Sequence, residues 1–104
     1  MDKQFQFSAR EAVSDYKQII SELGQEKIMS YYLNLPIDYN KLTKSPLRKD
    51  NKPTCGFYKS KSDKLYYHDF ALFESYDVMS VIMKRYSLDF YGAVRKLIED
   101  YINI

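Results

Sequence analysis

The 104-residue sequence has one cysteine, one histidine, three glycines, three prolines and no tryptophan. The single Cys55 excludes an internal disulfide and any zinc site built on paired cysteines, and it fits a reducing compartment. The low glycine and proline content argues against a disordered, low-complexity polymer. No apolar run approaches the roughly 20 residues that cross a bilayer, and the first ten residues lack the apolar stretch of a secretory signal. We therefore expect a folded cytoplasmic protein with no membrane partner.

The scarcity of histidine also restricts catalysis. His68 would need a catalytic partner placed beside it by the fold, so a structural or surface role is the simpler interpretation. The sequence has no glycine-rich loop for phosphates, and helix capping explains Asp77 more simply than Mg²⁺ binding does. We expect no enzymatic activity, no metal and no cofactor.

The formal net charge of +2 hides an uneven distribution. Residues 1–40 and 65–104 each carry a net charge of −2, whereas the segment between them carries +6, with only Asp50 and Asp63 opposing its basic residues. The eight basic residues of this segment are Lys41, Lys44, Arg48, Lys49, Lys52, Lys59, Lys61 and Lys64. A basic centre between acidic flanks is either a solvated surface or a site for an anionic partner.

Apolar residues at helical spacing predict two helices in the first third of the chain, over about 9–23 and 26–33. Ser8 and Glu11 have the spacing of a capping box at the start of the first helix. Gly24 supplies a left-handed stop at its end. These helices would pack as a pair.

The pattern changes after residue 38. A strand is predicted near 38–42, and the aromatic-rich segments 54–58 and 65–70 predict an antiparallel hairpin with a basic tip. Two further helices are expected after the capping residues Asp77 and Asp89. The chain should form one α+β domain, a small antiparallel sheet flanked by N-terminal and C-terminal helices.

Three segments follow one another in residues 45–100. They are SPLRKDNKPT, a predicted hairpin ending in YYHDF, and YDVMSVIMKRYSLDFYGAVRKLIED. Together, over residues 45–100, they resemble the amino-terminal zinc ribbon of phage and bacterial DNA primases. In its metal-binding members this family has four cysteine or histidine ligands, whose positions correspond here to Ser45, Arg48, Asp69 and Leu72. These four side chains cannot form the tetrahedral set that zinc needs.

The resemblance therefore implies a zinc-ribbon-like fold without metal. Its parts would be a helical extension over 1–37, a ribbon-like sheet over 38–75 and C-terminal helices over 76–104. In place of the metal, we expect Arg48 to bridge Asp50 or Asp69 through charge-assisted bonds that tie the loop to the second strand of the hairpin.

A nucleic-acid interface is predicted in the basic centre, because lysines neutralise phosphates while aromatic rings stack on bases. Aromatic residues alternate along both strands of the hairpin, so one face supplies the core and the other remains for binding. The predicted phosphate contacts are Arg48, Lys49, Lys52, Lys59, Lys61 and Lys64, and the predicted stacking platforms are Tyr58 and Tyr67.

Together with the resemblance, this pattern predicts a non-catalytic module that binds single-stranded DNA template in phage DNA replication. Its partners would be a primase polymerase domain or a replicative helicase, in the cytoplasm of a bacterial host. The alternative is a free-standing phage protein that reuses the primase fold to bind and modulate a host or phage protein. Whether the chain is complete or an excised domain stays open.

Overall fold

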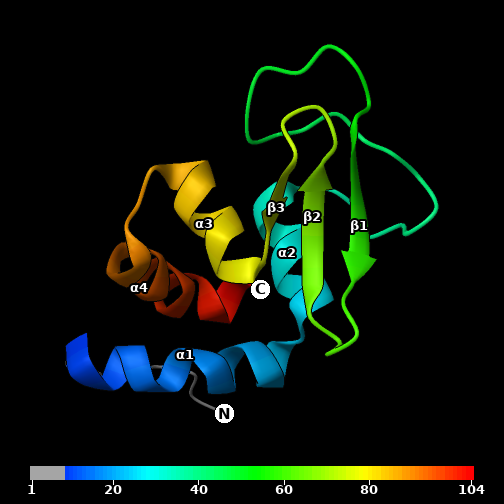
Figure 1. Ribbon diagram of the computed structural model, residues 1–104. Coiled ribbons are helices and arrows are strands. Elements are labelled where there is room, and N and C mark those ends of the chain that lie inside the picture. Colours follow the sequence, from blue (N-terminus) through cyan, green and yellow to red (C-terminus); the bar gives the residue numbers. More distant parts are fainter. Residues whose placement is uncertain (1–8) are drawn as a thin grey trace.

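Two helices, a three-stranded sheet and two more helices follow one another along the chain in the computed structural model (Figure 1), which describes residues 9–104 and the side chains of 15–104. The predicted α+β class is confirmed, and the capping box of Ser8 and Glu11 lies outside the described residues. The elements are α1 (Ala9–Leu23), α2 (Gln25–Leu33), β1 (Cys55–Lys59), β2 (Leu65–Asp69), β3 (Glu74–Tyr76), α3 (Val78–Tyr86), α4 (Phe90–Asp100) and a 3-10 turn (Tyr101–Asn103).

Local capping chemistry fixes the helix boundaries. Gly24 separates α1 from α2 with a positive φ of 91°, a backbone conformation that glycine adopts without strain. The carboxylate of Asp77 accepts the amide of Ser80 at 2.9 Å and begins α3. Asp89 does the same for the amide of Gly92 at 2.7 Å and begins α4. The predicted N-caps of both C-terminal helices are confirmed.

The sheet is antiparallel in the order β1-β2-β3, with β2 in the centre. The prediction of a strand near 38–42 is wrong. A turn occupies this segment, in which the Asp38 side chain accepts the amide of Asn40 at 2.9 Å. Among the described residues, one isolated bridge, Thr43 to Cys55, pairs the preceding loop with β1. The third strand, β3, was not predicted from the sequence.

The helices cover one face of this sheet and leave the other open. In Figure 1, α2 lies behind the strands and α3 packs beside β3, while α1 and α4 lie further from the sheet. The Tyr32 hydroxyl of α2 donates to Asp100 of α4 at 2.8 Å, which joins the two helical pairs. None of the described helices combines the length and apolarity needed to cross a membrane.

The core fills the space between the sheet's inner face and the helices. Each strand and each helix described with its side chains contributes to it. Its fully enclosed residues, all at most 1% exposed, are Ile28, Met29, Tyr32, Leu33, Cys55, Leu65, Tyr67, Val81, Ile82, Ala93, Val94 and Leu97.

Candidate nucleic-acid interface

A row of rings lines the outer face of the sheet, which is turned to the viewer in Figure 1. Side chains alternate along a strand, so Tyr58 of β1 and Tyr66 and His68 of β2 project away from the core. Phe70 continues the alternation just after β2. We call these four residues the aromatic row.

The rings of the aromatic row contact one another. Tyr58 and Tyr66 stand directly opposite in the register and stack with centroids 5.2 Å apart and planes 19° apart. The rings of His68 and Phe70 meet edge to face at 4.4 Å. Ser75 of β3 holds the middle of the row, because its Oγ lies 2.6 Å from His68 Nδ1 and 3.3 Å from the Tyr58 hydroxyl.

These contacts fix the rings and still leave much of their area accessible. Tyr58 is 42% exposed and Phe70 is 54% exposed. A pre-arranged, exposed ring loses little freedom when a base stacks on it, and stacking does not depend on base identity. The row therefore has the chemistry of a sequence-tolerant stacking platform.

A shallow groove of about 210 Å³ runs beside the row, between β1 and the preceding loop. Gly56 lets Leu42 pack against β1, since a Cβ at this position would stand only 3.0 Å from Leu42 Cδ2. Leu42 and Phe70 both line the groove, together with Tyr39 and Lys41. Sequence reasoning had not assigned this groove.

Three of the predicted phosphate contacts are engaged in ion pairs. Lys59 Nζ lies 2.7 Å from Glu26 Oε1, and Glu26 raises the pKa of this lysine. Lys64 Nζ lies 2.9 Å from Asp77 Oδ2. Arg48 is bonded to Asp69 at 2.7 Å. Much of the predicted positive charge is thus compensated within the fold.

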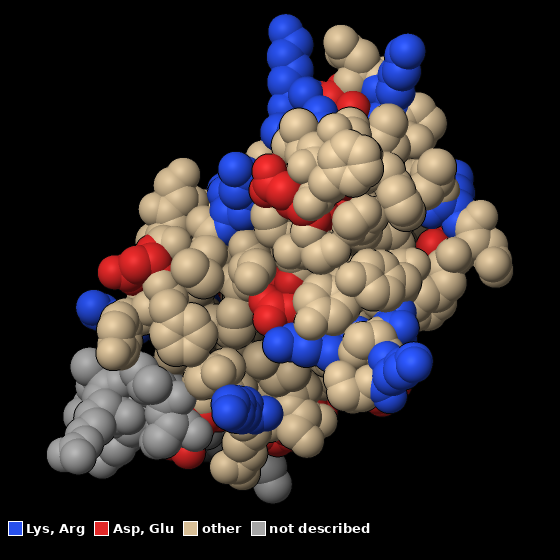
Figure 2. Space-filling view, viewed as in Figure 1, with Lys and Arg blue, Asp and Glu red and all other residues tan. Residues whose placement is uncertain are grey.

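The remaining cations of the basic centre are exposed. Within the part of the chain that the structure describes, Lys41, Lys44, Lys49, Lys52 and Lys61 form no ion pair. In Figure 2 the surface over the strands is largely uncharged, and basic side chains lie at its upper and lower margins. This arrangement suits a polyanion whose bases cross the sheet while its phosphates meet the margins.

Tyr67 requires a correction. It was predicted as a stacking platform, but it is 0% exposed and faces the core, where its hydroxyl lies 2.7 Å from Thr43 Oγ1. Burial raises its pKa, and no base can reach its ring in this arrangement. Its neighbour Tyr66, together with His68 and Phe70, takes the outward positions instead. The sequence did hold a signal for these outward positions. Cys55 and Leu65 are apolar and face the core, so residues at odd spacing from Leu65 along β2 should face outward.

The four positions that correspond to zinc ligands in the resemblance lie together in a polar cluster. Arg48 bridges two carboxylates, with Nε 2.7 Å from Asp69 Oδ2 and Nη1 3.5 Å from Asp50 Oδ1. The Ser45 amide donates to Asp50 at 2.8 Å, and the Leu72 amide donates to Asp69 at 3.1 Å. The predicted Arg48 bridge is confirmed, and it reaches both carboxylates.

We call Ser45, Arg48, Asp50, Asp69 and Leu72 the Arg48–Asp69 cluster. Its interactions favour the charged form of both carboxylates. The Arg48 guanidinium, with help from the amides of Leu72 and Ala71, lowers the pKa of Asp69 to about 2 despite its burial. The Ser45 amide is the main cause that lowers the pKa of Asp50. Among the described residues, no group of three or more His, Cys, Asp or Glu side chains gathers as metal ligands would. Ion pairing between Arg48 and Asp69 thus joins the loop to β2.

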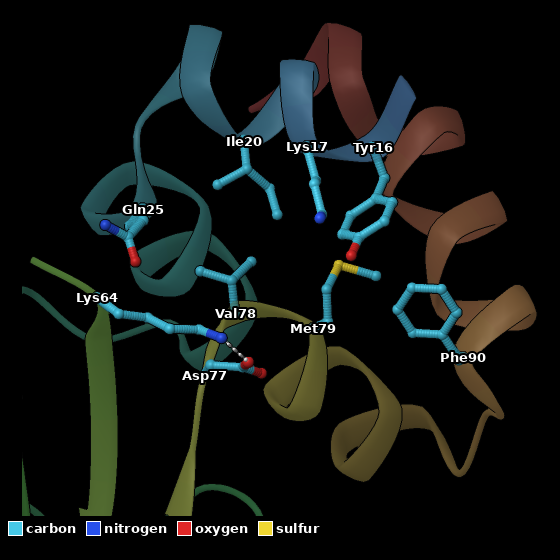
Figure 3. A pocket seen from close by; sticks show the side chains of 9 residues that line it. All are labelled: Tyr16, Lys17, Ile20, Gln25, Lys64, Asp77, Val78, Met79 and Phe90. Atoms are coloured by element: carbon cyan, nitrogen blue, oxygen red, sulfur yellow. Dashed lines mark ion pairs between the residues drawn. The ribbon is translucent and has the colours of Figure 1, made fainter. Parts of the chain in front are cut away.

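A second hollow, of about 230 Å³, lies on the helical side of the molecule (Figure 3). Ile20, Val78 and Phe90 give it apolar walls, and the Lys64–Asp77 ion pair spans one side. The side chain of Gln25 is already bonded to the backbone at Asp63 and Leu65. Most of its polar groups thus serve the fold, and we place the candidate interface on the sheet.

No family model matches this chain, and searches of curated proteins and of solved structures find no match either. The fold defines the class of this protein as an α+β domain with one covered and one open sheet face.

Proposed function

We propose that this protein is a single-stranded nucleic-acid-binding module that uses the open face of its sheet. The observation that carries the proposal is the aromatic row, whose rings are fixed in place and partly exposed. Bases would stack on Tyr58, Phe70 and the rings between them, each contributing about 1–3 kcal/mol. Duplex DNA offers no free base faces along its length, so single strands are the expected ligand.

The phosphates would contact the lysines that have no partner in the fold. Lys41 borders the groove beside the row, Lys61 lies at the tip of the β1–β2 hairpin, and Lys49 and Lys52 lie on the opposite loop. Lys59 and Lys64 contribute less, because binding a phosphate would compete with their carboxylate partners. The proposed site keeps Tyr58, Lys49, Lys52 and Lys61 from the sequence-based prediction.

Fluorescence anisotropy with a labelled single-stranded oligonucleotide tests this proposal. Tyr58→Leu should weaken binding by about tenfold, because one stacking ring is lost while the strand stays apolar. Tyr31→Leu is the matched control, since Tyr31 is also 42% exposed but lies on α2, behind the sheet. Its dissociation constant should stay within about twofold of the wild-type value.

Two variants that each remove one lysine charge complete the test. Lys61→Gln should reduce the slope of log affinity against log salt by about 0.7, the value for one phosphate contact on a single strand. Lys27→Gln, at an exposed position of α2, should leave the slope unchanged. Failure of the wild-type protein to bind at high micromolar concentration in low salt would refute the proposal and favour the protein-binding alternative.

The narrower proposal is a template-binding role in phage DNA priming, beside a polymerase domain or replicative helicase in the bacterial cytoplasm. It rests on the resemblance of residues 45–100 to primase zinc ribbons, and the gathering of Ser45, Arg48, Asp69 and Leu72 around two carboxylates supports it. A template role predicts tighter binding to single-stranded DNA than to RNA of the same sequence. Equal affinity in a competition assay would count against it.

A further inference from the structure

The turn between β2 and β3 presents an unusual residue. Phe73 is 85% exposed, and its backbone has a positive φ of 56°. The other non-glycine residues with positive φ in the described part of the chain are Asn34, Asp63 and Ser87, all small and polar. A bulky aromatic residue in this left-handed region is strained, and strain of this kind persists where surrounding contacts enforce it.

The Arg48–Asp69 cluster enforces this turn. Asp69 Oδ1 accepts the amides of Ala71 at 2.9 Å and Leu72 at 3.1 Å, and the same carboxylate is held by Arg48. The turn therefore projects Leu72, which is 47% exposed, and Phe73 into solvent from a fixed base. At 85% exposure, the Phe73 ring buries little apolar area within the fold.

The surroundings of the turn favour a nucleic acid as its partner. Phe70, the last ring of the aromatic row, belongs to the same turn, so the projection continues the proposed binding surface. Arg48 belongs to the loop that carries the unpaired Lys49 and Lys52, and its 2.7 Å bond to Asp69 holds this loop next to the turn. The acidic neighbour Glu74 accepts the Tyr76 hydroxyl at 2.6 Å.

We infer that Leu72 and Phe73 stack on the terminal base pair where a duplex opens into the single strand bound by the aromatic row. Two adjacent apolar side chains cover a base pair better than a single base, and apolar wedges of this type are used against base stacks. The ligand class is thus a junction between single-stranded and double-stranded nucleic acid. This inference rests on the proposed function and extends it.

The test compares three labelled DNAs by anisotropy: a single strand, the same strand as an overhang on a duplex hairpin, and the blunt hairpin. The wild-type protein should bind the overhang about tenfold more tightly than the single strand, the gain from one further stacking contact. The variant Phe73→Asn, which tolerates positive φ, should lose this preference and keep its single-strand affinity. Ile102→Asn, at another position where an exposed apolar side chain is removed, is the control and should retain the preference.

Two further readouts separate a binding role from a structural one. A 2-aminopurine at the junction should change its fluorescence with the wild-type protein but not with Phe73→Asn. The melting temperature of Phe73→Asn should equal or exceed that of the wild type, because the left-handed strain is relieved; a lower melting temperature would make the ring structural and overturn the inference.

The remaining outcomes are also decisive. Equal wild-type affinity for the single strand and the overhang overturns the junction inference and leaves the proposed function standing. A preference that survives Phe73→Asn shows that the Phe73 ring does not contact the junction, and it also overturns the inference. Absence of binding to every DNA refutes the proposed function itself.

Discussion

Replacing Asp69 by asparagine tests whether the Arg48–Asp69 cluster stabilises the fold. Asp69 is 2% exposed and accepts two bonds from Arg48 and one each from the Ala71 and Leu72 amides. Breaking a buried ion pair by removing one partner costs about 3–5 kcal/mol. Because the Arg48 side chain stays 25% exposed, water can partly solvate it, so we expect the lower end, about 3 kcal/mol.

A loss of this size should lower the melting temperature by roughly 15 °C in a domain of this length, measured by circular dichroism or calorimetry at neutral pH. Glu99→Gln is the control, because it neutralises an exposed carboxylate and should change stability by less than about 0.5 kcal/mol. Arg48→Ala should also destabilise, and the double variant should lose clearly less than both single variants together. A melting temperature of Asp69→Asn within a few degrees of the wild type, or strict additivity, would refute the reasoning.

Three further predictions concern charge and hydrogen bonding. The folded pKa of Asp69, about 2, lies below its ordinary value of 3.8, so its stabilising contribution is complete above pH 4 and disappears as the pH falls toward 2; the difference in melting temperature between wild type and Asp69→Asn should shrink across this range. Asp77→Ala removes both the N-cap of α3 and the ion pair with Lys64, and urea denaturation should report a loss of about 1–2 kcal/mol. Tyr32→Phe deletes the hydroxyl that donates to Asp100 and should cost about 1 kcal/mol in a thermal melt.

Local signals were sufficient for the helices, because a cap acts within one turn of the chain. Asp77, Asp89 and Gly24 each act on backbone groups within about four residues, and the end of α1 and the starts of α2, α3 and α4 follow from them. The strands depend on partners further away. β3 is three residues long and forms because it pairs with β2. Its own sequence is too short to show the alternating pattern that predicts a strand.

The candidate site shows the same division between local and distant determinants. Tyr66 and Tyr67 are adjacent and have the same side chain. A shift of one residue in strand register would therefore exchange the buried ring for the outward one. Because aromatic residues occur at both inward and outward positions of β2, the sequence of this strand alone does not show which ring is buried. That is decided by how the inner face packs against the helices. The prediction of the Arg48 bridge came from the resemblance and not from a local signal, because Arg48 and Asp69 lie 21 residues apart in the sequence.

The ion pairs of the basic centre give a last quantitative prediction. Counted along the sequence, eight cations between 41 and 64 are available for phosphates, but in the fold Arg48, Lys59 and Lys64 are held by carboxylates. At about 0.7 per contact, the five remaining lysines limit the salt slope for a single strand to about −3.5, whereas eight would allow about −5.6. Measuring affinity over a series of salt concentrations distinguishes these limits. A slope clearly steeper than −3.5 would mean that binding breaks the ion pairs. Glu26→Gln together with Asp63→Asn removes both carboxylate partners of Lys59, and in that case this double variant should leave the slope unchanged instead of steepening it.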